Sequence, residues 1–235
     1  MAIKICLDAG HYGKYNRCPG IPAYYESEMN WKLHGLLKKE LEKFGISVTT
    51  TRAAQDRDLD LVSRGRASAG CDLFLSIHSN AVGSEMNEQV DYPVVHVQLD
   101  GRGDALGKKL ADTITRAMDT RQAGYIKTRK GNHGEYYGVL RGAAAVGTVG
   151  MILEHSFHTN TRSTKWLMDD QNLATLAAAE AKVIGEYFGL TAQPEALYRV
   201  QIGAYTQKAN AERQLERAKA AGFSDAFITV SEGQP

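Results

Sequence analysis

The chain has 235 residues, and 43% of them are hydrophobic, so it can bury one full core and still supply a small second unit. Its 28 Lys and Arg residues balance 27 Asp and Glu residues, which leaves no overall field to attract nucleic acid or an anionic membrane. The three cysteines are an odd, irregularly spaced set, which argues against a disulfide framework and for free thiols in a reducing compartment.

The N-terminal segment MAIKICLDAG has no basic stretch followed by a long apolar run. No other segment approaches the roughly 18 consecutive apolar residues that a membrane-spanning helix needs. We therefore expect synthesis in the cytoplasm without a signal peptide, and no membrane insertion.

Hydrophobic periodicity predicts alternating strands and helices along most of the chain. In chain order, the predicted elements are a strand at 3–7, a helix at 29–44, a strand at 46–51, a helix at 61–69, strands at 72–78 and 93–99, a helix at 106–118, a strand at 149–154 and a helix at 173–188. This alternation predicts an α/β fold: a mostly parallel mixed sheet flanked by helices on both faces, with the active site at the carboxyl ends of the strands.

Residues 119–138 interrupt the alternation. The stretch DTRQAGYIKTRKGNHGEYYG is rich in basic residues, glycine and tyrosine, and it has no helix or strand period. A long loop of this kind in a compact domain is either functional or mobile. We expect it to form a rim that contacts substrate, with a simple solvated loop as the alternative.

The C-terminal part reads as a separate unit. We expect a first domain at 1–189, a linker at 190–197 that contains LTAQPE, and a second unit at 198–235. The second unit shows a strand pattern YRVQIGAY, a helix at 208–221 and a strand pattern FSDAFITV. Such a small βαβ unit is too short to hold a core of its own without a partner.

Polar residues follow three of the predicted strands, where a catalytic site is expected. His11 follows the first strand, and His78 ends the third. Catalytic zinc commonly takes two His and one carboxylate and keeps a position for water. Glu26, just before the first helix, is the preferred carboxylate; Glu28 competes with it, and Cys18 is a candidate soft ligand.

Glu154 ends the fifth apolar run and is the candidate general base, because hydrolysis assisted by a metal still needs a group that takes a proton from water and gives one to the leaving group. A phosphate-binding role for GHYG is disfavoured, since neither glycine-rich nucleotide spacing is present. The other histidines are expected to have packing, surface or substrate-contacting roles: His34, His96, His133, His155 and His158.

Several separated segments carry a resemblance to a known family. They are LDAGHYG, ESEMN before the long helix, TR at 51 and 52, SRGRASAG, FLSIHSNA and GVLRGAAAVGTVGMILEHSFHTN. In this order and spacing, over about residues 1–190, they resemble the zinc-dependent N-acetylmuramoyl-L-alanine amidases of the amidase-3 type. Two positions depart from the family pattern: Tyr12 stands where a second glycine is usual, and Ser156 precedes Phe157 where Gly-Phe is common.

The resemblance implies one Zn²⁺ per chain on His11, Glu26 and His78, with Glu154 as the catalytic glutamate. It also implies cleavage of the amide between N-acetylmuramic acid and L-alanine in peptidoglycan, with the glycan strand and the peptide stem as partners. A wall-binding protein without turnover, and a zinc peptidase or sugar deacetylase acting on another cell-wall bond, are the alternatives.

The tail YRVQIGAYTQKANAERQLERAKAAGF resembles the first half of a SPOR peptidoglycan-binding unit. A full unit is about twice as long, so we expect either a continued sequence or a dimer formed through two half-units. A wall amidase without a signal peptide resembles both phage endolysins and sporulation autolysins. In either role, it is expected to reach the cell wall after lysis or holin-type release.

Overall fold

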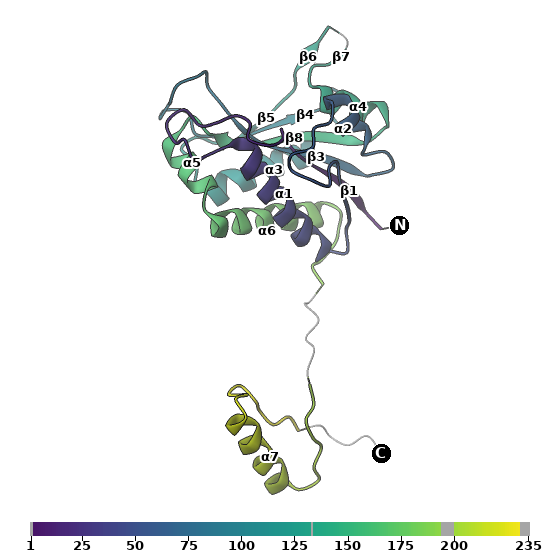
Figure 1. The fold of residues 1–235 in the computed structure, drawn as a ribbon. Coiled ribbons are helices and arrows are strands. Elements are labelled where there is room, and N and C mark those ends of the chain that lie inside the picture. The colour runs from purple at the N-terminus through teal and green to yellow at the C-terminus, as the bar shows by residue number, and fades with distance from the viewer. Residues whose placement is uncertain (1, 133, 194–199, 231–235) are drawn as a thin grey trace. The chain divides into compact units, whose positions relative to one another are not determined.

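The computed structural model describes residues 2–132, 134–193 and 200–230 (Figure 1). The chain divides into two units, Met1–Pro194 and Glu195–Pro235, and each is described by itself.

The first unit is built on a six-stranded sheet. In spatial order its strands are β2 (Ser47–Thr50), β1 (Lys4–Ala9), β3 (Leu73–Asn80), β8 (Val149–Phe157), β4 (Val94–Val97) and β5 (Tyr125–Lys127). All neighbouring pairs are parallel except β4 with β8, which are antiparallel. The predicted mostly parallel mixed sheet is therefore confirmed.

Helices cover both faces of this sheet, as predicted (Figure 1). The helices α1 (Glu26–Glu42), α3 (Asp104–Met118) and α6 (Asp170–Tyr187) pack over one face, where the larger apolar cluster lies. The helices α2 (Leu61–Arg66) and α4 (Gly138–Ala145) pack over the other face, above a smaller cluster that includes Phe74 and Leu140. The short helix α5 (Thr161–Leu167) follows β8.

The segment 119–138 contains more structure than its sequence suggests. Tyr125–Lys127 forms the edge strand β5, and β6 (Lys130–Gly131) pairs with β7 (Gly134–Glu135) in a separate hairpin. These strands have three residues or fewer, too short to show a period of two. The helices α4 and α5 were likewise not predicted, because eight and seven residues give little periodicity.

In the second unit, α7 (Lys208–Ala220) confirms the predicted helix. The segments on either side of it make no ladder of strand hydrogen bonds within residues 200–230. Their apolar residues are exposed, Val200 to 89% and Val230 to 93%, so residues 200–230 offer no second layer that would bury them. Among the helices of the described residues, none is long and apolar enough to cross a lipid bilayer.

Candidate metal centre

The three predicted strand ends meet at one edge of the sheet. The strands β1, β3 and β8 are neighbours, so the loop after β1 places His11 beside the end of β3, which carries His78. In the parallel pairing of β3 with β8, His78 lies opposite Glu154. Side chains that are far apart in the sequence therefore meet at the carboxyl edge of a parallel sheet.

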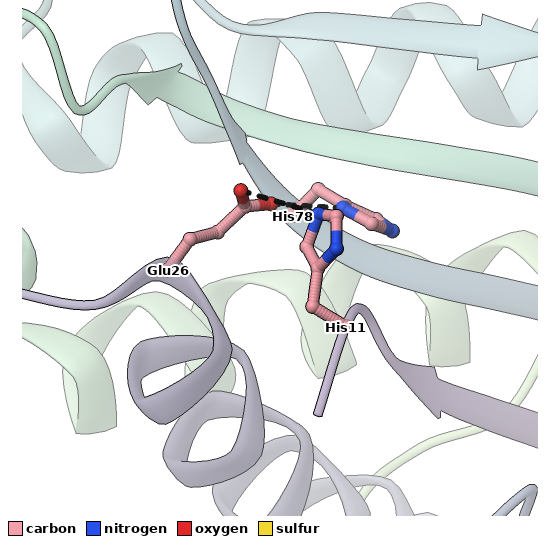
Figure 2. A group of neighbouring side chains, drawn as sticks. All are labelled: His11, Glu26 and His78. Atoms are coloured by element: carbon pink, nitrogen blue, oxygen red, sulfur yellow. Dashed lines mark hydrogen bonds and ion pairs between the residues drawn. The ribbon is translucent and has the colours of Figure 1, made fainter. Parts of the chain in front are cut away.

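His11, Glu26 and His78 form one compact group (Figure 2). Their ligand atoms all lie within 4.8 Å of one another. Nδ1 of His78 is 2.8 Å from Oε1 of Glu26, and Nε2 of His11 is 3.3 Å from Oε2. Two imidazoles and one carboxylate are a donor set that suits catalytic zinc, so these residues fit the metal that the sequence predicts.

Glu26 reaches this group from the first turn of α1 (Figure 2). It is 1% exposed, and it accepts hydrogen bonds from the side-chain amide of Asn16 at 2.6 Å and the backbone N–H of Ser79 at 3.2 Å. Burial alone would raise the pKa of Glu26, but the hydrogen bonds and charges of His11 and His78 hold it well below its usual range. The carboxylate is thus kept ionised, as a metal ligand must be.

The two competing ligands are not in the group. Glu28 is partly exposed on α1 and lies outside the cluster. Cys18 is buried, and its Sγ contacts Sδ of Met86 at 3.8 Å and Oγ1 of Thr164 at 3.9 Å. Cys18 therefore packs as a small apolar residue.

The backbone before His11 is tightly constrained. His11 has a φ of +59°, a left-handed conformation that is uncommon for a residue with a side chain. A Cβ atom at Gly10 would lie only 2.2 Å from Cε1 of His78, so the His78 imidazole lies directly against this glycine. The buried Arg64 donates to the backbone carbonyls of Ala9 and His11 at 3.4 Å each, and these hydrogen bonds also hold the loop.

The backbone of His78 is held by a buried pair of side chains, His155 and Glu180. Nδ1 of His155 donates to the carbonyl oxygen of His78 at 2.9 Å, and Nε2 of His155 lies 2.6 Å from Oε1 of Glu180 on α6. Both side chains are fully buried. The β3–β8 register shifts between His78 and Asn80, so the imidazole supplies a donor where the strand ladder is interrupted.

Glu154 lies on β8 with its Oε2 buried and without a hydrogen-bond partner. Burial, together with the nearby Glu26 carboxylate, raises the pKa of Glu154 well above its usual range. Two neighbouring carboxyl groups therefore have opposite shifts, one held ionised and the other disposed to take up a proton. This division is typical of hydrolytic sites.

The remaining histidines among the described residues have structural contacts. Nδ1 of His34 contacts the carbonyl oxygen of Trp31 in its own helix, and His96 is buried on β4. His158 lies behind the metal group, with Nδ1 3.0 Å from Oγ of Ser79. His133 lies outside the described residues.

Comparison with known proteins decides the family. The family model described as N-acetylmuramoyl-L-alanine amidase matches residues 5–186, and the SPOR domain model matches 194–235. The chain is 30% identical over 230 residues to the N-acetylmuramoyl-L-alanine amidase CwlM of Bacillus licheniformis, covering 96% of this chain and 84% of that protein. The chain belongs to the N-acetylmuramoyl-L-alanine amidase family.

Other known amidases are similar to this chain in sequence or in fold. A sporulation-specific N-acetylmuramoyl-L-alanine amidase of Bacillus subtilis is 26% identical, with 96% of this chain and 84% of that protein covered. The catalytic domain of the amidase CwlV from Bacillus (Paenibacillus) polymyxa has a similar fold, with a TM-score of 0.68 at 20% identity, over 80% of this chain and 99% of that one. An amidase from Clostridium difficile has the same TM-score and identity, over 80% and 97%.

The predicted family, fold and enzyme class are thereby confirmed. The protein is a cell-wall amidase that acts on peptidoglycan, and its SPOR domain is a peptidoglycan-binding module.

Proposed function

We propose that this amidase is zinc-dependent, that His11, Glu26 and His78 hold one zinc ion, and that Glu154 transfers the proton. The supporting observation is the meeting of two imidazoles and one carboxylate within 4.8 Å, next to the strand position of Glu154. A zinc ion bound there would supply Lewis-acid polarisation of the scissile carbonyl and compensate its developing negative charge.

Glu154 acts twice in the proposed hydrolysis of the bond between N-acetylmuramic acid and L-alanine. It first accepts a proton from the attacking water, whose oxygen bonds to the carbonyl carbon. It then gives the proton to the alanine nitrogen as the C–N bond breaks, which leaves a carboxylic acid on the sugar's lactyl group and an amine on the peptide; the acid proton then passes to the amine or to solvent. The raised pKa of Glu154 favours the first transfer, because it makes the carboxylate a stronger base toward the attacking water.

The cellular setting is also part of the proposal. The likeness to a sporulation-specific amidase favours action on the wall after the producing cell lyses, with holin-type release as the endolysin alternative. For the SPOR region we propose that two C-terminal half-units pair between chains. This pairing would cover exposed apolar residues such as Val200.

Product analysis tests the proposed reaction. Purified peptidoglycan is digested with the full chain, and new amino termini and new sugar amines are labelled and identified by mass spectrometry. New L-alanine amino termini that require zinc support the proposal. New sugar amines, or amino termini on another residue, would replace it with a deacetylase or a peptidase.

A further inference from the structure

The hairpin β6–β7 and the start of α4 surround an open hollow on the protein surface. Arg129, Lys130, Tyr136 and Arg141 line it, and we refer to these four residues as the basic pocket. In Figure 1 the hairpin extends from the sheet on the side where α2 and α4 lie.

Two of the three cations of the basic pocket, Arg129 and Arg141, are held in place by contacts that leave their charges uncompensated. The Arg129 guanidinium lies 3.4 Å above the centre of the Tyr136 ring. Arg141 donates through Nη1 to the backbone carbonyls of Glu135 at 3.0 Å and Tyr136 at 2.7 Å. Within the described chain, none of Arg129, Lys130 and Arg141 has an ion pair with a carboxylate.

Glu135 is the acidic residue of this hollow, and one of its two oxygens is engaged. Its Oε1 accepts a hydrogen bond from the backbone N–H of Leu99 at 2.5 Å, whereas its buried Oε2 has no hydrogen-bond partner among the described residues. One carboxylate against three cations leaves a net positive hollow, whose guanidinium groups suit a bidentate carboxylate ligand.

The basic pocket lies on the same face of the sheet as Glu154. Tyr137, which follows the hairpin, has its hydroxyl 3.3 Å from Nε2 of His96 on β4. In the antiparallel pairing of β4 with β8, His96 lies opposite Ile152, and Ile152 shares a sheet face with Glu154 two residues on. The pocket therefore borders the side on which the proton-transferring carboxyl projects.

Lys127 and Arg129 bring positive charge to this border. Burial is the main reason that the pKa of His96 is lowered to about 4, and the charges of Lys127, His78 and Arg129 lower it further. A neutral sugar gains little from such a field, and Arg129 already covers one face of the Tyr136 ring. Both observations favour an acidic peptide over a glycan in this pocket.

We propose that Arg129, Lys130 and Arg141 form a specificity subsite that binds a free carboxylate of the peptide stem, next to the scissile alanine bond. This inference rests on the proposed amidase function. It predicts that the enzyme discriminates between stems whose second residue carries a free α-carboxylate and stems in which that group is a carboxamide.

The test uses two muropeptides that differ only in this group, and the full-length zinc-loaded protein. Wild-type kcat/KM is expected to be about tenfold higher for the carboxylate, mainly through KM, since charge-assisted hydrogen bonds to Arg and Lys are lost with the amide. The R129Q/K130Q variant is expected to lose this preference, so that its kcat/KM values for the two stems become equal within about a factor of two.

The matched control is K108Q/K109Q, which removes two exposed charges from α3 on the opposite face of the sheet and is expected to keep the preference. An R129Q/K130Q variant that keeps the wild-type ratio would overturn the subsite. If the wild type cleaves neither muropeptide, the proposed reaction fails instead. The binding of both muropeptides to E154Q and to E154Q/R129Q/K130Q is then measured by calorimetry, which tests the subsite separately. E154Q should bind the carboxylate stem more tightly than the amidated stem. Equal binding of the two stems by E154Q would overturn the subsite.

Discussion

Glu180 of α6 and His155 of β8 form a fully buried ion pair, with 2.6 Å between Oε1 and Nε2. The other imidazole nitrogen donates to the carbonyl of His78, so this pair connects the helix layer to the backbone of a proposed metal ligand. A buried ion pair is weak evidence for stability in itself, because desolvation offsets most of the attraction. Its geometry indicates that it positions His78.

Replacing Glu180 should separate the effect of the pair on stability from its effect on the position of His78. E180Q is expected to lower the free energy of unfolding by about 3 kcal/mol, because one partner of a buried pair is left without its charge. Zinc affinity should fall as well, because the imidazole is no longer held as a donor to His78. Urea unfolding and zinc titration measure the two quantities. E186Q on the exposed side of the same helix is the control and should change stability by less than about 0.5 kcal/mol.

A double replacement sharpens this prediction. H155L/E180L replaces the pair with apolar side chains and should recover much of the lost stability. It should not recover zinc affinity, since the His78 carbonyl still lacks its donor. Full recovery of zinc binding would show that the pair has only a packing role.

The same pair predicts a pH dependence of stability. Burial alone would lower the pKa of His155, but the charge and hydrogen bond of Glu180 and the His78 carbonyl together raise it above its ordinary value of about 6.5. Because the pKa of His155 is raised in the folded state, its protonation contributes its full stabilisation of the folded protein below about pH 6.5. This contribution is lost as the pH rises through the raised pKa. In the presence of chelator, the stability advantage of wild type over H155Q/E180Q should shrink above pH 6.5. An advantage that grows with pH would contradict this assignment.

Gly10 offers a local test of the metal group. The Cβ of G10A would meet the His78 imidazole at 2.2 Å, so the ring must move. We expect a stability loss of about 1–3 kcal/mol, typical of overpacking, together with at least a tenfold loss of zinc affinity. G35A is the matched control, because Gly35 lies in α1 with no neighbour within 4 Å of an added Cβ. It should bind zinc normally and gain up to about 1 kcal/mol from helix propensity.

Much of this site follows from the sequence, because its residues stand where predicted strands end. His11, His78 and Glu154 each follow or close an apolar run, and neighbouring parallel strands bring such positions to one edge. The choice of Glu26 over Glu28 depended on which side of α1 faces the sheet edge, and the structure shows Glu26 buried in the group.

The supporting residues were not predicted, because they depend on contacts between distant elements. Asn16 donates to Glu26 from an irregular loop that carries no periodic signal. Glu180 did leave a signal: it lies on the same helix face as Leu176 and Ile184, at a spacing of four, so a carboxylate interrupts an apolar stripe. Such a residue needs a buried partner, which here is His155.

Replacing the proposed catalytic and metal-binding residues should give different defects. E154Q is expected to keep zinc and to lose about 10²–10⁴-fold in kcat, because only the proton transfer is removed. H78A should lose both zinc and activity. Metal analysis beside the rate assay separates the two, and an active E154Q enzyme would remove Glu154 from the mechanism.

The proposed zinc ligands are tested most directly by zinc K-edge X-ray absorption of the loaded full-length protein. We predict two imidazole nitrogens and one carboxylate oxygen near 2.0–2.2 Å, a fourth light ligand, and the loss of one imidazole contribution in H11A. A sulfur ligand near 2.3 Å, as Cys18 would supply, or a zinc environment unchanged by H11A would contradict the proposed site.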